Sequence, residues 1–174
     1  MVLATEFRDA MSRLGAAVNV VTTDGSAGLG GFTASAVCSV TDSPPTLLVC
    51  MNRCSQQYAR FSENGVLCVN VLAAEQEQVS RVFSGQMRNS IEERFEQTGY
   101  ARLTTGAPAV AESLVSFDCE IERIEEVGTH GVFICRVVQI WAGSQTGGLL
   151  YFNRQYHRLT SPEPRHECAT ARIG

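Results

Sequence analysis

The pattern that most constrains the fold is an alternation of apolar and polar side chains that begins at residue 115. The odd-numbered positions carry Val115, Phe117, Cys119 and Ile121, whereas the even-numbered positions from 116 to 122 carry serine or acidic residues. Successive side chains of a strand point to opposite faces of a sheet, so this spacing predicts a half-buried antiparallel strand with the even-numbered residues facing solvent. Such a strand needs hydrogen-bonded neighbours, and a fold rich in β-structure is therefore expected.

Further strands are predicted on both sides of this segment. Apolar runs separated by turn residues predict strands at 16–23, 46–51, 66–72, 132–141 and 149–152, and one or two more within 31–45. Many strands with short helical insertions favour a closed antiparallel barrel with helices at its rim. The same periodicity also fits a sandwich of two sheets.

Four short helices are predicted between these strands. The first has Phe7, Met11 and Leu14 at helical spacing, with Thr5 as a possible cap and Gly15 just past the end. The others are expected at 55–61, at 75–83 and from residue 90, where a serine and the glutamate three positions later form a capping-box pattern.

The chain has 174 residues, of which 44% are hydrophobic and 18% are charged, and its net charge at pH 7 is −4. This size and composition predict one globular domain, expected at residues 1–160, followed by a tail at 161–174 that has no periodicity. Because no run of lysine or arginine is present, nucleic-acid binding is not expected. No apolar run approaches the ~20 residues of a membrane helix and no signal peptide is recognised, so a cytoplasmic protein is expected.

The seven cysteines are odd in number, and most lie in apolar runs. This predicts buried free thiols in a reducing compartment instead of disulfides. Cys50 and Cys54 have a spacing that zinc ligands can use, but no second Cys/His pair follows at finger spacing. No metal site is therefore predicted.

The segment 31–45 combines an apolar strand pattern with small hydroxyl residues at Thr33, Ser35, Ser39 and Thr41. Small side chains let a flat or phosphorylated ligand approach the backbone, and hydroxyls and amides can hydrogen-bond its anionic oxygens. The same pattern fits an ordinary strand with a polar outer face. Residue chemistry alone leaves both interpretations open.

This segment resembles the signature of the short-chain flavin reductases, because it reads Gly-Phe-Thr-Ala-Ser-Ala-Val-Cys-Ser-Val-Thr-Asp-x-Pro-Pro. These enzymes are the reductase components of two-component flavin monooxygenases, such as 4-hydroxyphenylacetate 3-monooxygenase. Further matches follow in the family's order at residues 7–11, 16–23, 67–72, 128–130 and 148–152, so the resemblance covers residues 5–160. It implies a split β-barrel that binds FMN and forms a homodimer, with a nicotinamide dinucleotide held loosely over the flavin.

The resemblance also implies roles for individual residues. The flavin ring and ribityl chain are expected to contact Thr33, Ala34, Ser35, Ala36, Ser39 and Val40. Further cofactor-binding residues are expected to be Asn52, Ser55 and Arg60 near the phosphate, and Phe61, Phe83, Ser84, Tyr151 and Tyr156 elsewhere. His130 is expected to border the nicotinamide pocket and is the predicted catalytic residue. Each role has a structural alternative: a helix cap for Ser55, core packing for the phenylalanines, dimer packing for the tyrosines and a plain turn residue for His130.

Other catalytic motifs are not recognised in the sequence: no Gly-x-Gly-x-x-Gly opens a βαβ unit, and neither a Walker-type loop nor a nucleophile elbow is found. With the resemblance, the chain is predicted to be an NAD(P)H-dependent flavin reductase. Such an enzyme passes hydride from NADH or NADPH to FMN, or to FAD, and supplies reduced flavin to a partner oxygenase. Two alternatives stay open: an FMN-bound reductase that reduces another acceptor such as a cobalt corrinoid, and a non-catalytic flavin-binding protein.

Overall fold

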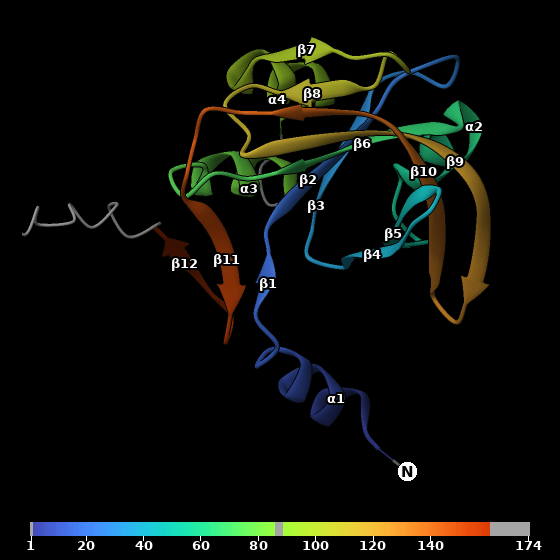
Figure 1. Cartoon of the computed structure of the whole chain (residues 1–174). Helices are drawn as coiled ribbons and strands as arrows, with labels where there is room; N and C mark the ends of the chain where they lie inside the picture. Colours follow the sequence, from blue (N-terminus) through green and yellow to red (C-terminus); the bar gives the residue numbers. More distant parts are fainter. Residues whose placement is uncertain (1, 86–88, 161–174) are drawn as a thin grey trace, which may run out of the picture.

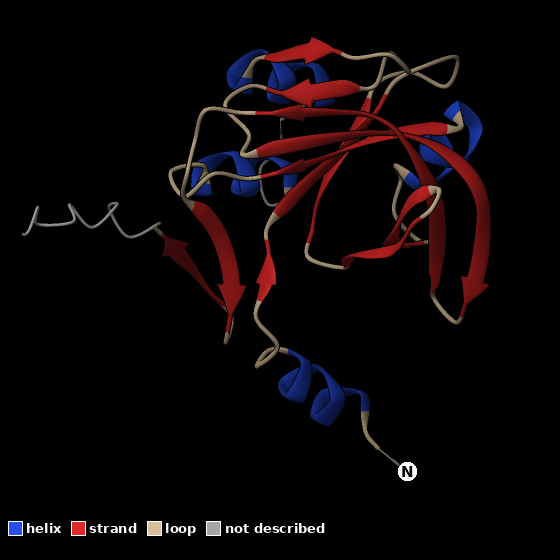
Figure 2. Cartoon of the chain, in the orientation of Figure 1, coloured by secondary structure: helices blue, strands red, loops and turns tan. Residues whose placement is uncertain are grey.

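The computed structural model describes residues 2–85 and 89–160, and these residues are mainly β with short helices, as predicted (Figures 1 and 2). The helices are α1 (Ala4–Met11), α2 (Tyr58–Asn64), α3 (Glu77–Phe83) and α4 (Ile91–Thr98). The strands are β1 (Ala16–Ala17), β2 (Asn19–Thr23), β3 (Gly30–Ala34), β4 (Val37–Asp42), β5 (Pro45–Asn52), β6 (Val66–Val71), β7 (Tyr100–Arg102), β8 (Pro108–Val110), β9 (Val115–Val127), β10 (His130–Ala142), β11 (Gly148–Phe152) and β12 (Gln155–Leu159). In this part of the chain no helix is long and apolar enough to cross a membrane. The predicted tail at 161–174 lies outside the described residues.

Seven strands form one antiparallel sheet in the order β3-β2-β6-β9-β10-β5-β4. The two edge strands, β3 and β4, follow one another in the sequence and are joined by Ser35 and Ala36 alone. Because this connection is so short, the two edges must lie close together, and the sheet curls into a barrel (Figure 1). Within the described residues no ladder joins β3 to β4, so the barrel is open at this seam. The split barrel that the resemblance implied is confirmed, whereas the fully closed barrel that the strand pattern favoured is wrong at the seam.

Apolar side chains from several strands fill the interior of the barrel. Val21, Val69 and Phe133 are at most 1% exposed and belong to one buried cluster. α2 contributes Phe61 to the same cluster, and its ring meets that of Phe32 edge to face, with the ring centres 5.2 Å apart. Burial of these side chains supplies most of the stabilisation of the barrel.

A second core packs α3 and α4 against the outside of the barrel beside β3. Phe83 of α3 and Phe95 of α4 are each 1% exposed, and their ring centres lie 5.1 Å apart. A Cβ atom at Gly31 of β3 would lie only 2.8 Å from Cε1 of Phe83. Glycine at this position therefore lets α3 approach the strand that borders the seam.

The first half of β9 is buried on both faces, which corrects the predicted alternation. Ser116 and Asp118 were expected to face solvent, but both are 0% exposed. Asp118 accepts hydrogen bonds from the backbone N–H of Thr105 at 2.8 Å and from its hydroxyl at 2.5 Å. Ser116 donates to Oδ1 of Asn70 at 2.8 Å, and that oxygen also accepts from the N–H of Val110 at 2.9 Å. The segment containing β7 and β8 thus covers this part of the sheet.

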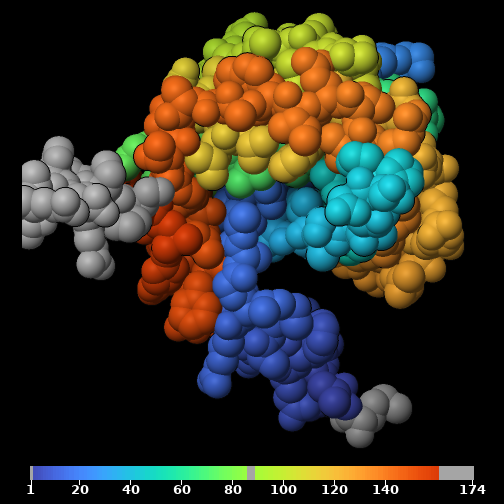
Figure 3. Space-filling view, viewed as in Figure 1, coloured from blue at the N-terminus to red at the C-terminus, as the bar shows by residue number. Residues whose placement is uncertain are grey.

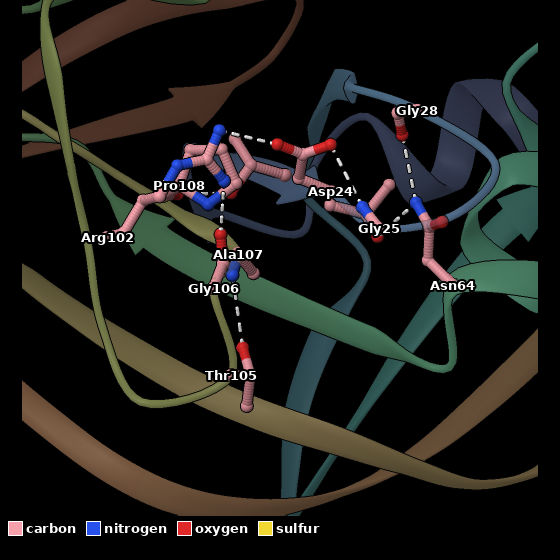
Figure 4. Close-up of polar contacts among 11 residues, drawn as sticks. Asp24, Gly25, Gly28, Asn64, Arg102, Thr105, Gly106, Ala107 and Pro108 are labelled. Atoms are coloured by element: carbon pink, nitrogen blue, oxygen red, sulfur yellow. Dashed lines mark hydrogen bonds and ion pairs between the residues drawn. The ribbon is translucent and has the colours of Figure 1, made fainter.

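Figure 4 shows how the same segment is held to the loop that follows β2. Arg102 forms an ion pair with Asp24 at 2.5 Å and donates to the carbonyl of Gly106 at 2.6 Å. Asn64 donates to the carbonyl of Gly28, in the same loop, at 2.9 Å. These contacts lie at the upper side of the molecule in Figure 1, whereas the β3–β4 seam lies at its lower side.

The predicted elements are present with shifted ends. α1 has its N-cap at Leu3, so Thr5 lies inside the helix instead of capping it, and the helix ends at Met11, before the predicted Leu14. The predicted strand at 16–23 is divided at Val18, because β1 pairs with β11 while β2 pairs with β3 and β6. α2 begins three residues after Ser55, with Gln57 at its N-cap. The capping box of α4 is confirmed, since the hydroxyl of Ser90 accepts from the N–H of Glu93 at 3.2 Å. Strands β7, β8 and β12 were not predicted.

Candidate functional site

Many of the predicted site residues surround one cleft next to the seam. The cleft has a volume of about 210 Å³, and its lining includes Thr33, Ala34, Ser35, Ser84, Tyr151 and Tyr156. These residues come from β3, the end of α3 and the β11–β12 hairpin, which are far apart in the sequence. Figure 3 shows the β11–β12 hairpin, in orange to red, beside the blue segment of β1, with which β11 pairs.

Hydrogen bonds hold three elements together at the wall of this cleft. The hydroxyl of Thr33 donates to the carbonyl of Ser80 at 2.6 Å, and the hydroxyls of Ser80 and Tyr156 lie 2.8 Å apart. Ser80 is 0% exposed, so its polar groups depend on these partners. The hydroxyl of Thr33, which was expected to face a ligand, is therefore committed to an internal contact that ties β3 to α3.

Two tyrosine rings and a guanidinium group stand at the open side of the cleft. The rings of Tyr151 and Tyr156 meet edge to face with their centres 5.2 Å apart, and Tyr151 is 36% exposed. The guanidinium of Arg81 lies 5.3 Å from the ring centre of Tyr156. A hydrogen bond from Arg81 to Glu77 raises the pKa of Arg81, whose guanidinium is positively charged at neutral pH in any case. Aromatic faces of this kind can stack against a flat heteroaromatic ligand.

The seam itself presents backbone hydrogen-bonding groups. In the described part of the chain β3 pairs only with β2 and β4 only with β5, so the other edge of each strand is not part of a ladder. Ser35 and Ala36 connect these edges and are exposed, and the carbonyl of Ala36 accepts from the N–H of Cys50 at 3.0 Å. Farther along β4, Ser39 lines a separate, mainly apolar groove, and Val40 is 50% exposed. A planar ligand with donors and acceptors along one edge fits a seam of this kind.

A second group of predicted residues lies where β5 and β10 meet. His130 is the register partner of Asn52, and the N–H of Arg53 donates to the carbonyl of Thr129 at 2.9 Å. The side chains of Asn52 and Ser55 accept from backbone N–H groups of the turn before α2, at 2.9 Å and 3.3 Å. The imidazole of His130 is exposed, with Nδ1 2.9 Å from the hydroxyl of Thr129.

Three predicted residues are used inside the protein. Phe61 and Phe83 are each 1% exposed, in the barrel core and in the second core, so the structure places them in the core instead of beside an open cleft. The guanidinium of Arg60 donates to the carbonyl of Leu29 at 2.6 Å. The structural alternative of core packing, which the sequence left open for the phenylalanines, is the one observed.

Sequence reasoning missed Ser80, which lines the cleft, and Arg81, which lies against the ring of Tyr156. Ser80 carries no local signal, because its role arises only when α3 packs on β3 and β12. Arg81 does carry one, since Glu77 lies four residues before it on the same helix and forms an ion pair with it at 2.6 Å. That pairing predicts a helix face but says nothing about a neighbouring tyrosine.

A split antiparallel barrel with a tyrosine-lined cleft beside its open seam places this chain among small β-barrel proteins. Residues 11–160 match the profile of the flavin reductase like domain, which covers most of the chain. The chain therefore belongs to the flavin reductase-like family, and the family predicted from the sequence is confirmed.

Similar proteins agree with this membership. A protein of Cronobacter sakazakii named FMN reductase (NADH) RutF is 56% identical over 156 residues, which are 90% of this chain and 93% of that protein. A protein of Serratia proteamaculans with the same name is 53% identical over 154 residues, covering 88% of this chain and 87% of that protein.

Solved structures of flavin reductases have the same fold. BorF, the flavin reductase component of a bacterial two-component tryptophan halogenase, superposes with a TM-score of 0.85 at 28% identity, covering 92% of this chain and all of that one. The NADH:FAD oxidoreductase SgcE6 of Streptomyces globisporus, solved with NAD and FAD fragments, has a TM-score of 0.82 at 26% identity, covering 92% of this chain and 94% of that one.

Proposed function

We propose that this chain is a flavin reductase that uses NADH to reduce FMN. The observation that carries the proposal is the tyrosine-lined cleft at the seam, in a chain 56% identical to a protein named FMN reductase (NADH). When bound, the flavin supplies the redox chemistry: it takes up a hydride from the dihydronicotinamide and a proton from solvent, which leaves NAD⁺ and reduced flavin. The protein then needs only to bind the flavin and the dihydronicotinamide, to orient them against each other and to exclude water. No acid–base triad is required.

The residues at the seam fit a flavin. The ring of a flavin is planar and has alternating hydrogen-bond donors and acceptors along one edge. The open strand edges at Ser35 and Ala36 offer backbone groups of both kinds, and Tyr151 and Tyr156 offer aromatic faces. We assign Ala34, Ser35 and Ala36 to the ring edge, the tyrosines and Ser84 to the surrounding wall, and Ser39 and Val40 to the continuation along β4.

His130 is proposed to border the nicotinamide. Its exposed imidazole is oriented by the hydroxyl of Thr129 and lies beside the end of β5. There it can orient a carboxamide by a hydrogen bond without taking part in the hydride transfer. Asn52 and Ser55 were expected near the phosphate, but Asn52 is the register partner of His130, so both are proposed instead to complete this end of the site through the turn that precedes α2.

The reduced flavin is proposed to leave for a partner oxygenase, as the description of BorF as the reductase component of a two-component enzyme suggests. A homodimer is also proposed, because α1 has no buried residue and its Phe7 and Met11 are 59% and 46% exposed. A cytoplasmic location is proposed from the six described cysteines, all of which are free thiols.

The test is a matrix of cofactors and acceptors with the purified protein. NADH oxidation is measured with FMN, FAD or riboflavin, and with NADPH in place of NADH. Fast turnover of NADH with FMN, and release of reduced flavin to oxygen, is the expected result. Flavin that stays bound during gel filtration and reduces an added cobalt corrinoid faster than oxygen would favour the corrinoid alternative. If the protein binds flavin but does not oxidise NADH, it would be a non-catalytic flavin-binding protein.

A further inference from the structure

A second hollow adjoins the cleft at the place where α1 meets the β11–β12 hairpin. Its volume is about 430 Å³, and its polar lining consists of Arg8, Ser12, Ser35, Tyr151 and Arg154. Ser35 and Tyr151 line both this hollow and the cleft, so the two spaces adjoin at these side chains. A ligand with its ring in the cleft can extend into the hollow.

Arg8 carries a positive charge that the described residues do not neutralise. Among them its guanidinium forms neither an ion pair nor a hydrogen bond, whereas the guanidinium groups of Arg53, Arg81, Arg102, Arg136 and Arg158 are each paired with a carboxylate. An unpaired guanidinium in a hollow is available for a bidentate contact with a phosphoryl group.

Arg154 occupies a backbone position that favours glycine. It follows Asn153 in the two-residue turn between β11 and β12, and the two residues have φ angles of 60° and 47°. A turn with two positive φ angles is type I′, for which Asn-Gly is the preferred sequence. An arginine held in such a conformation points to a role for its side chain.

Contacts between α1 and this turn keep the second guanidinium at the hollow. The N–H of Asn153 donates to the carbonyl of Ser12 at 2.6 Å, and Arg154 forms an ion pair with Asp9. Asp9 offsets one positive charge, so Arg8, Arg154 and Asp9 together leave a net charge of +1 beside the hydroxyls of Ser35 and Tyr151. The hollow is therefore suited to an anion.

We infer that this hollow binds a phosphoryl group of the nucleotide whose ring occupies the cleft. The inference rests on the proposed function for the identity of that nucleotide, and the group has two sources. It is either the terminal phosphate of FMN or the pyrophosphate of the dinucleotide.

The first experiment does not depend on activity. Inorganic pyrophosphate is titrated into the protein without flavin, and binding is followed by calorimetry and by thermal stabilisation. Arg8→Gln is compared with Arg13→Gln, which removes the same charge from an exposed residue that does not line the hollow. The expected result is pyrophosphate binding that Arg8→Gln weakens about tenfold and Arg13→Gln leaves unchanged. No binding by the native protein, or equal effects of the two substitutions, would overturn the inference.

The second experiment distinguishes the two sources. If the hollow holds the FMN phosphate, Arg8→Gln weakens the binding of FMN about tenfold and leaves the affinity for riboflavin, which has no phosphate, unchanged. If it holds the dinucleotide, flavin affinity is unchanged and the Michaelis constant for NADH rises about tenfold. If Arg8→Gln has the FMN affinity and the Michaelis constant for NADH of the native protein, the inference is overturned while the proposed function stays intact. A native protein that binds pyrophosphate through Arg8 but does not oxidise NADH would instead overturn the proposed function alone.

Arg154→Gly separates binding from folding. Glycine relieves the positive φ angle, so the melting temperature should be equal to or above that of the native protein, while pyrophosphate binding falls. A variant that keeps full pyrophosphate affinity would show that Arg154 takes no part in the site, and the two-arginine assignment would be wrong.

Discussion

The hydrogen bond between Tyr156 and Ser80 provides a quantitative test of how the cleft wall is held. The two hydroxyls lie 2.8 Å apart, and Ser80 is 0% exposed. Tyr156→Phe removes one partner and leaves the hydroxyl of Ser80 buried without its bond. Leaving a buried polar group unsatisfied costs about 1–3 kcal/mol, and the free energy of unfolding should fall by about 1–2 kcal/mol. For a chain of this size that corresponds to a loss of roughly 2–8 °C in melting temperature.

The matched control is Tyr151→Phe. This tyrosine is 36% exposed, so its hydroxyl can be hydrated, and the free energy of unfolding should change by less than about 0.5 kcal/mol. The double variant Ser80→Ala/Tyr156→Phe leaves neither hydroxyl behind and should be less destabilised than the sum of its single substitutions, by about 1 kcal/mol. Urea unfolding followed by fluorescence is measured for the native protein, for Tyr156→Phe, Tyr151→Phe and Ser80→Ala, and for the double variant. Equal stability of Tyr156→Phe and Tyr151→Phe, or simple additivity in the double variant, would refute this account of the wall.

Three further predictions concern packing, the nicotinamide and the buried thiols. Gly31→Ala places a Cβ 2.8 Å from Cε1 of the buried Phe83 and should lower the free energy of unfolding by about 1–3 kcal/mol. The control is Gly15→Ala, whose Cβ would have its nearest neighbour 4.0 Å away and should cost far less. Equal melting temperatures of the two variants would contradict the close approach. His130→Ala should raise the Michaelis constant for NADH about fivefold, the scale of one lost hydrogen bond, with flavin affinity unchanged in a fluorescence titration; native kinetics would leave His130 a plain turn residue. Burial raises the pKa of Cys135 to about 12 from an ordinary value of 9.0. Between these two pH values the unfolded chain releases a proton that the native protein keeps. The contribution of this thiol to the free energy of unfolding is therefore fully present below about pH 9 and should be lost as the pH rises toward 12. Melting temperatures at about pH 8 and about pH 10 check the sign, Cys135→Val should reduce the drop, and a rise in melting temperature with pH would contradict it.

The sequence revealed those parts of the fold that depend on local pattern. The capping box at Ser90 and the apolar face of β9 were predicted correctly, because capping and strand alternation are decided by neighbouring residues. The burial of Ser116 and Asp118 was not predicted, since it depends on a covering segment near Thr105 that has no alternation of its own. Long-range packing decided their environment.

In the candidate site, too, the sequence predicted what depends on local pattern and missed what depends on long-range packing. The resemblance located Ser35, Tyr151 and Tyr156, and the structure brings them to one cleft. It could not show that Phe61 and Phe83 are buried, because an aromatic residue on a short helix has the same local pattern whether it meets a ligand or a core. Arg8 and Arg154 were absent from the predicted site for a related reason: they meet only through the packing of α1 on the last hairpin.

The central claim, reduction of FMN by NADH at the seam, is tested most directly by rapid mixing without oxygen. Protein loaded with FMN is mixed with NADH, and the absorbance of oxidised flavin is followed with NADH and with NADH carrying deuterium at the transferred position. The account predicts complete bleaching in one phase that saturates with NADH and is slower with the deuterated donor. Bound FMN that stays oxidised in the presence of excess NADH would contradict the account.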